Sequence, residues 1–338
     1  MSSRDEPVFF ALARAEDAVS RLDEIARACP FAEGWTRRLD FAEAVAWGWN
    51  HGSVVTHDDL LLHDGMLDAQ VPEPAIITAR GLLVARRRAR HAGPELLSAA
   101  GISWLAGAGK RPPLPTLARA RRSRGRRTES LPQISRLDGL AATLKAAAAG
   151  VSDTVHENLT EWLTLFLDPE LEVPHLLKAA FALEAWSIID PLPRRGYLGP
   201  VLVAQWLHAE NRVLSGLIGI EGGFRVRSRQ ASGRGLADPL SRLTFWLDVL
   251  AAAAAAGVAE IQRLALARSM LERRTRSRRA SSKAPDVIDY VMGHPLVTAR
   301  DLATSLNISG TSARRLIEQF APTLKEVTGR SHYRAWRL

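Results

Sequence analysis

The C-terminal stretch PDVIDYVMGHPLVTARDLATSLNISGTSARRLIEQFAPTLKEVTGRSHYRAWRL, residues 285–338, decides the fold of this end of the chain. It opens with a short apolar segment over Asp286 to Met292. Pro285 is a favourable first-turn residue, and Gly293 and Pro295 are typical of the end of a helix. These signals predict a first short helix.

A second short helix follows from a pair of capping residues. Thr298 can cap a helix N-terminus, and Asp301, three residues later, can complete a capping box. We expect the helix to stop near Asn307, because asparagine tolerates the left-handed backbone conformation. The inward positions are Leu302, Ala303 and Leu306.

A third helix is predicted after the turn at Asn307, with Ser309 as its cap. Its apolar face consists of Ala313, Leu316, Ile317 and Phe320. Its outer face consists of Thr311, Arg314, Arg315 and Glu318. Because an arginine can form a two-pronged pair with guanine in the major groove, Arg314 and Arg315 are the candidates for base readout.

Two strand-like segments close the chain, Leu324 to Thr328 and Tyr333 to Leu338, joined through residues 329–332. Three short helices followed by a hairpin are the order of a winged helix-turn-helix. The basic residues of the hairpin are Lys325, Arg330, His332, Arg334 and Arg337. Such a wing suits a phosphate backbone or a minor groove.

The sequence thus predicts a module that binds double-stranded DNA. The expected contact residues are Ser309, Thr311, Arg314, Arg315, Lys325, Arg330, His332 and Arg334. The alternative is a winged helix that docks on another protein, with the basic face a coincidence.

The charge distribution favours the first interpretation. The net charge is +9, and residues 259–338 carry 15 Lys and Arg against 7 Asp and Glu. The other 258 residues carry 30 and 29, so the body is almost neutral. A neutral body with a basic end is typical of a nucleic-acid-binding tail module, although an arginine-rich solvated surface would give the same balance.

Upstream, apolar residues recur every three or four positions, so the body is expected to be all-α. The predicted division is 1–107 as an N-terminal helical region, 108–132 as a Pro/Arg-rich linker, 133–272 as a helical domain, 273–284 as a basic linker and 285–338 as the winged helix-turn-helix. Cys29 is the lone cysteine, which excludes an internal disulfide. The longest apolar stretch, Val249 to Ala259, is short of the roughly 20 residues that span a bilayer. We therefore expect no membrane contact and a cytoplasmic location.

Two segments resemble Fic-family proteins. The wing sequence LKEVTGRSHYRAWRL is similar to wings attached to Fic proteins, and VPHLLKAAFALEAWSIIDP, Val173 to Pro191, is similar to the helix leading into the Fic motif His-Pro-Phe-x-(Asp/Glu)-Gly-Asn-Gly-Arg. The resemblance implies a Fic-like helical bundle and, in active members, transfer of AMP from ATP to a hydroxyl.

The residues that would carry that chemistry are changed. Asp190 stands at the position of the catalytic histidine, the acidic metal ligand is missing, and Arg-Gly-Tyr replaces Asn-Gly-Arg. Pro200 also removes a backbone N–H where a phosphate cradle needs donors. Near the N-terminus, EAVAWGWNHGS, Glu43 to Ser53, is similar to the segment that restrains the Fic nucleotide site, with His51 in place of its second glutamate. The resemblance therefore implies a body that has lost its catalysis.

The densest group of metal-ligand residue types is His57, Asp58, Asp59, His63 and Asp64. We interpret Asp58 as a helix cap rather than a ligand, so no metal or cofactor is expected. The leading hypothesis is a DNA-binding transcriptional regulator whose Fic-like body forms homo-oligomers or senses a ligand. The alternatives are a Fic-like nucleotidyl or phosphate transferase with unorthodox residues, and an antitoxin-like scaffold that grips another protein.

Overall fold

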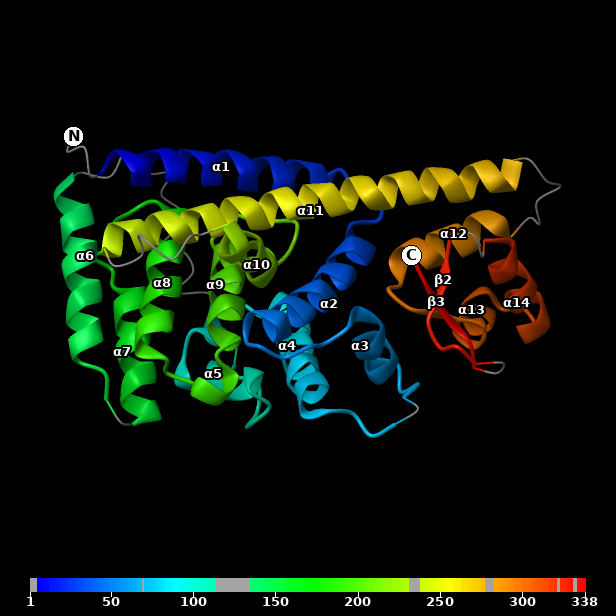
Figure 1. Cartoon of the computed structure of the whole chain (residues 1–338), viewed down its shortest axis with the longest axis horizontal. Coiled ribbons are helices and arrows are strands. Elements are labelled where there is room, and N and C mark those ends of the chain that lie inside the picture. Colours follow the sequence, from blue (N-terminus) through cyan, green and yellow to red (C-terminus); the bar gives the residue numbers. More distant parts are fainter. Residues whose placement is uncertain are drawn as a thin grey trace. The chain divides into compact units, whose positions relative to one another are not determined.

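A computed structural model describes residues 5–68, 70–113, 134–152, 154–230, 238–276, 283–320, 323–330 and 333–338. The chain forms two compact units, each built from separate stretches of sequence (Figure 1). Unit 1 comprises Met1–Asp23 and Gly81–Ala255, and unit 2 comprises Glu24–Arg80 and Ala256–Leu338. The units are therefore interleaved in sequence, unlike the consecutive segments of the predicted division. Packing between distant segments, which composition does not reveal, produces this arrangement.

Unit 1 is helical. Its elements are most of α1 (Glu6–Arg27) and of α4 (Pro74–Arg90), α5 (Ala99–Leu105), α6 (Ile134–Ala149), α7 (Val155–Leu167), α8 (His175–Ile189), α9 (Leu198–Ala209), α10 (Ile220–Gln230), the first part of α11 (Pro239–Arg276), and the 3-10 turns η1 (Pro94–Leu96) and η3 (Pro193–Arg195).

Helix α8 is the centre of unit 1, and it packs against α6, α7 and α9 (Figure 1). It is buried on nearly all sides, as expected for a helix that is apolar all round. Its one buried carboxylate, Glu184, accepts hydrogen bonds from Arg242 and from the Trp246 indole, each at 2.8 Å. These bonds fix α8 against α11.

Unit 2 contains the C-terminal module together with N-terminal helices. Its elements are α2 (Ala32–Asn50), α3 (His57–Asp64), the start of α4, the end of α11, α12 (Ala284–Gly293), β1 (Val297–Thr298), α13 (Ala299–Leu306), α14 (Gly310–Gln319), β2 (Lys325–Glu326) and β3 (Ala335–Arg337).

The strands of unit 2 form one antiparallel sheet in the order β1-β3-β2. The prediction of an all-α chain with a C-terminal winged helix-turn-helix is confirmed. The two predicted hairpin strands pair as expected, with Lys325 opposite Arg337, but they are shorter than predicted. The third strand, β1, was not predicted, because two residues that pair with β3 leave no alternating pattern in the sequence.

Helix α2 packs closely against α12 in unit 2. A Cβ atom on Gly34 would lie 2.0 Å from the carbonyl oxygen of Met292, so only glycine allows this approach. One turn further along α2, the guanidinium of Arg38 is buried against the end of α12. The C-terminal module is therefore joined to a helix from the opposite end of the sequence.

Helix α11 contains the most apolar long segment of the described chain. An 18-residue window has a mean hydropathy of 1.5, which by length and composition alone would allow it to cross a membrane. Of that window, 44% is buried inside the protein, and the core helix of a soluble protein passes the same test.

Candidate nucleic-acid interface

Thr298 caps α13 as the sequence predicts. Its hydroxyl accepts the backbone N–H of Asp301 at 3.1 Å and donates to the Asp301 carboxylate at 2.7 Å. In a capping box the carboxylate would take the backbone N–H of the cap residue instead, so that detail of the prediction is wrong. The cap fixes the first turn of α13 next to β1.

The turn between α13 and α14 also follows the predicted chemistry. Asn307 ends α13 in the left-handed conformation, with φ of 50°. Ser309 then caps α14, accepting the backbone N–H of Ser312 at 3.2 Å. Three residues thus connect the two helices, and α14 starts in a fixed direction.

Helix α14 has two faces. Its buried face consists of Ala313, Leu316 and Ile317, followed by Phe320 after the last turn. Its exposed face consists of Gly310, Thr311, Ser312, Arg314, Arg315 and Glu318. Among the described residues, no carboxylate lies within ion-pairing distance of Arg314 or Arg315. Their guanidinium groups are therefore available to a ligand.

The wing is shaped by the carboxylate of Glu326. It accepts the backbone N–H of Thr328 at 2.8 Å and of Gly329 at 3.1 Å, and also the Thr328 hydroxyl. Partial burial raises the pKa of Glu326, but these hydrogen bonds lower it by more, so the pKa lies below its usual range. Gly329 has φ of +63°, which lets the chain turn at this point. An acidic residue thus organises the turn of the wing.

Arg334 lies on the wing just before β3, with its guanidinium 5.3 Å from the centre of the Trp336 ring. Trp336 is buried, so the ring is a fixed platform for an exposed cation. Tyr333, beside it, is 81% exposed. Arg330 is half-buried, and the predicted contact His332 lies outside the described residues.

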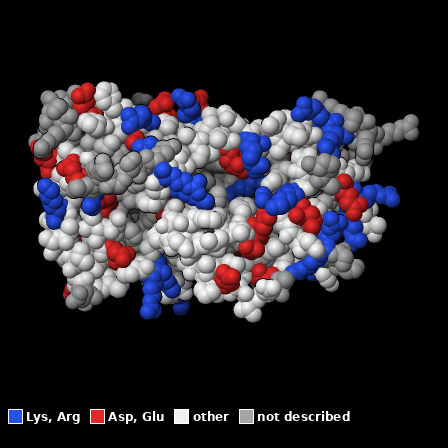
Figure 2. All heavy atoms as spheres, viewed as in Figure 1, with Lys and Arg blue, Asp and Glu red and all other residues white. Residues whose placement is uncertain are grey.

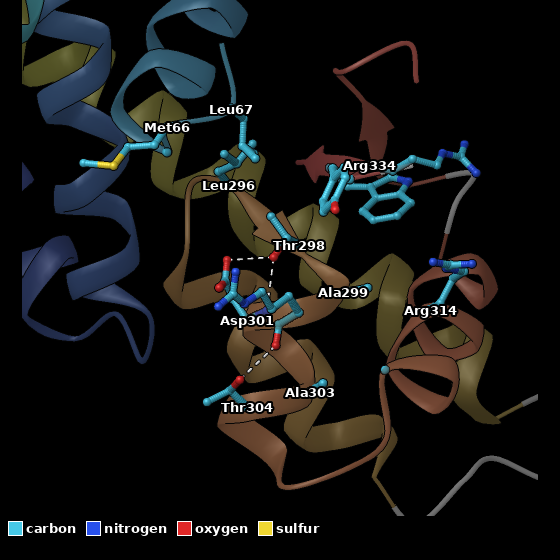
Figure 3. Close-up of a pocket in the computed structure, with 15 residues that line it drawn as sticks. Met66, Leu67, Leu296, Thr298, Ala299, Asp301, Ala303, Thr304, Arg314 and Arg334 are labelled. Carbon is cyan, nitrogen blue, oxygen red and sulfur yellow. Dashed lines mark hydrogen bonds between the residues drawn. The ribbon is translucent and has the colours of Figure 1, made fainter. Parts of the chain in front are cut away.

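A groove of about 1000 Å³ separates the start of α14 from the wing (Figure 3). Arg314 and Arg334 lie on one side of the groove, and Met66 and Leu67, from the segment after α3, lie on the other. Arg300 on α13 also lines it, as does the single carboxylate of Asp301. The charged residues that line the groove are thus three arginines and one aspartate, and the groove brings together two of the predicted contact residues.

Two residues of the groove were missed by sequence reasoning. Arg300 follows the Thr298 cap by two positions, and this spacing alone places it in the first turn of α13. Met66 has no such signal. It is 84% exposed with φ of 53°, and only the packing of α3 within unit 2 brings it to the groove.

Lys325, a predicted contact residue, already has a partner. Its ammonium lies 2.7 Å from the carboxylate of Asp58, and the same carboxylate accepts the Nε–H of Arg337 at 2.5 Å.

The interpretation of Asp58 as the cap of α3 is wrong. Thr56 is the cap, and its hydroxyl accepts the backbone N–H of Asp59 at 3.1 Å. On the face shown in Figure 2, basic and acidic side chains alternate over the C-terminal elements.

Comparison with known proteins agrees with this geometry. A family model described as an HTH DNA binding domain matches residues 284–338, and another, described as a protein of unknown function (DUF1612), matches residues 153–276. The chain is 30% identical over 362 residues to the uncharacterized protein y4cF of Sinorhizobium fredii, covering 94% of this chain and 93% of that protein. The chain belongs to the y4cF family. Its C-terminal end is a helix-turn-helix DNA-binding domain.

In this y4cF-family chain, the segment compared with the Fic motif packs against the indole ring of Trp186. The Trp186 indole donates to the carbonyl of Gly196 at 2.9 Å. A Cβ atom on Gly199 would lie 2.4 Å from the Trp186 ring. Asp190, at the position of the Fic catalytic histidine, ends α8 in the left-handed conformation with φ of 44°. The start of α9 at Leu198 is fully buried.

The other segment compared with Fic proteins lies at the end of α2. Glu43 is buried, and His51, at the position of the second Fic glutamate, is exposed after the last turn. The His51 ring stacks on Trp47, with 3.4 Å between the ring centres. This segment belongs to unit 2, whereas the Asp190 segment belongs to unit 1.

Proposed function

We propose that this protein is a transcriptional regulator that reads double-stranded DNA with α14 and holds the neighbouring backbone with the wing. The observation that carries the proposal is the exposed start of α14. Arg314 and Arg315 lie on it, and no carboxylate of the described chain pairs with them. Such a face can enter a major groove and donate paired hydrogen bonds to a guanine.

The wing and the groove support the same function. Arg334 lies on the same side of the groove as Arg314, and Arg300 adds a third cation from α13 (Figure 3). With Arg314 directed to the bases, a phosphate backbone beside the recognition helix would meet the guanidinium groups of Arg300 and Arg334. Contacts of this kind supply affinity and position without reading sequence. Because the helix-turn-helix works on chromosomal DNA, we propose that the protein acts in the compartment that holds it.

Selection of bound duplexes from a random pool, using the full chain, tests the proposal. We expect an enriched sequence, and we expect Arg314→Ala to weaken binding to that sequence by about 1–3 kcal/mol. Arg21→Ala is the matched control, because it removes the same charge from an exposed residue of α1 that pairs with Asp17. Failure to enrich any sequence would contradict readout by α14.

We also propose that the body of the chain is non-catalytic and serves self-association or ligand sensing. The support lies in unit 1, where the start of α9 is buried beneath the Trp186 indole. A helix start binds phosphate through exposed N–H groups, and this one is covered. Incubation with labelled ATP should give no transfer to the protein itself. Transfer that Asp190→Ala abolishes would establish a transferase instead.

Sedimentation of the full chain tests the second part of that proposal. A dimer, or a shift in mass when a metabolite is added, would support self-association or sensing. A monomer whose mass and DNA affinity no added metabolite changes would contradict it.

A further inference from the structure

Asp58 lies outside the matched helix-turn-helix domain, but its carboxylate contacts two basic residues of the wing. It lies in the first turn of α3, more than 260 residues before β2 and β3 in the sequence. Its two oxygens are divided between two cations: Oδ2 lies 2.7 Å from the Lys325 ammonium, and Oδ1 lies 2.5 Å from Nε of Arg337. All three residues belong to unit 2.

The sheet register explains why a carboxylate is needed here. Lys325 on β2 stands directly opposite Arg337 on β3. Like charges opposite each other across a strand pair repel, so this pair is unfavourable without an anion. Asp58 supplies the anion for both.

The charge of the domain makes this contact important. Residues 284–338 contain 7 Lys and Arg against 5 Asp and Glu, so the domain itself carries a formal charge of only +2. Most of the basic excess of the C-terminus lies earlier, in residues 259–283, which contain 8 Lys and Arg against 2 Asp and Glu. A single carboxylate that pairs with two of these seven cations therefore offsets a large share of the positive charge that the domain can offer to DNA.

We propose that Asp58 is an internal competitor of the DNA phosphates, which keeps Lys325 and Arg337 from contacting DNA and so limits the affinity of the protein for DNA of any sequence. This inference rests on the proposed DNA binding. It assigns phosphate contact to Arg300 and Arg334, leaves base readout to Arg314, and removes Lys325 from the contact residues that the sequence suggested.

The two cations differ in how firmly Asp58 holds them. The Lys325 side chain is 62% exposed, and exposed ion pairs contribute little to stability. The Arg337 side chain is 27% exposed, and its hydrogen bond to Asp58 is shorter. Burial raises the pKa of the Asp58 carboxyl, but the hydrogen bonds and charges of Lys325 and Arg337 lower it by more. The pKa is therefore below its usual range, and the carboxylate keeps its charge at neutral pH. Lys325 is the cation that loss of the Asp58 charge would release.

The test is the salt dependence of binding of the full chain to a random-sequence duplex, measured by fluorescence anisotropy. The affinity falls by about 0.9 log units per log unit of salt for each phosphate neutralised. We expect Asp58→Asn to bind more tightly at low salt and to steepen the slope by about 0.9, because one further cation reaches a phosphate. The introduced amide would keep the size of the side chain and an oxygen for Arg337.

Asp59→Asn is the matched control. It removes the same charge from the adjacent residue, whose carboxylate accepts a hydrogen bond from the Thr56 hydroxyl and makes no described ion pair with the wing. We expect it to leave the slope unchanged. Equal steepening by the two variants would show a general effect of net charge and would overturn the inference.

Lys325→Ala separates release of the cation from displacement of the wing. In the wild-type background it should leave the slope unchanged, and in the Asp58→Asn background it should remove the steepening. If Lys325→Ala makes the slope shallower by about 0.9 in the wild-type background, Lys325 already contacts a phosphate. That result would overturn the inference even if Asp58→Asn failed to fold. A wild-type chain that binds no duplex would contradict the proposed function as well, whereas binding with an unaltered Asp58→Asn slope would contradict the inference alone.

Discussion

Arg38 on α2 donates a hydrogen bond to the carbonyl of Met292 on α12, with 2.6 Å between Nη1 and the oxygen. The same buried guanidinium donates to the carbonyls of Val291 at 2.7 Å and of His294 at 2.8 Å. The last carbonyls of a helix have no partner within the helix. A residue from the N-terminal part of the chain thus completes the first helix of the DNA-binding domain.

Replacement of Arg38 should destabilise unit 2. Arg38→Met fills similar space but leaves buried carbonyls without a donor, at a cost of about 1–3 kcal/mol for each group left unpaired. Urea unfolding should show a lower free energy of unfolding, together with weaker DNA binding. Arg21→Met is the control. Arg21 is exposed on α1 and pairs with Asp17 one turn away, so we expect a loss below about 1 kcal/mol. Equal losses for both variants would contradict the capping role.

Gly34→Ala tests the close approach of α2 to α12. The added methyl would lie 2.0 Å from the Met292 carbonyl, so one of the helices must shift. Overpacking of this kind costs about 1–3 kcal/mol, and contact with backbone should place it at the upper end. Thermal unfolding of Gly34→Ala and Gly310→Ala gives the comparison, because a methyl on Gly310 meets nothing within 4 Å. A variant as stable as the wild type would show that the two helices can separate.

In unit 1, Gly199→Ala should clash with the Trp186 ring, which would lie 2.4 Å from the new atom. We expect a loss of about 1–3 kcal/mol in the free energy of unfolding and a change in tryptophan fluorescence. Gly139→Ala in α6 meets nothing within 4 Å and should instead stabilise the helix by about 0.5–1 kcal/mol. A tolerated Gly199→Ala would mean that the Trp186 indole can leave the start of α9.

His57 should make the stability depend on pH. Burial, helped by the nearby charge of Arg337, lowers the pKa of His57 to about 4, from an ordinary value near 6.5. Its Nδ1 has no hydrogen-bond partner among the described residues. Between these two pH values the unfolded chain binds a proton at His57 that the folded chain does not. The contribution of the neutral His57 to the free energy of unfolding is therefore fully present above about pH 6.5 and is lost as the pH drops toward 4.

The free energy of unfolding, measured by urea at several pH values, checks this dependence. The contribution of His57 amounts to at most about 3 kcal/mol across the interval, at 1.36 kcal/mol per pKa unit. His57→Gln, which does not titrate, should show a flatter profile between pH 4 and 6.5. Identical slopes for the variant and the wild type would assign the effect to other groups.

The local chemistry of the C-terminal domain could be predicted, because each signal lies within a few residues of its partner. Thr298 and Ser309 cap the helices that their positions predict, and Asn307 has the left-handed conformation expected of it. The buried and exposed faces of α14 follow from the spacing of Ala313, Leu316 and Ile317. Periodicity and capping are short-range properties, so one sequence is enough to read them.

The rest depends on contacts between distant residues. Nothing near Arg38 or Asp58 indicates that they meet α12 and the wing, which lie about 250 to 280 residues later. The assignment of Lys325 to DNA followed from its charge alone, and charge does not reveal a partner elsewhere in the chain. The Fic resemblance stays a hypothesis, because the comparisons show the y4cF family and the helix-turn-helix domain but do not identify a Fic ancestry.

Equilibrium binding of Arg314→Ala distinguishes base readout by α14 from phosphate contact. The full chain and the variant are titrated against the selected duplex and against a scrambled duplex of equal length, at one salt concentration. We expect a loss of about 1–3 kcal/mol on the selected duplex and a much smaller loss on the scrambled one, because only the first offers the base that Arg314 reads. Equal losses on both duplexes would make Arg314 a phosphate contact and would contradict readout by α14.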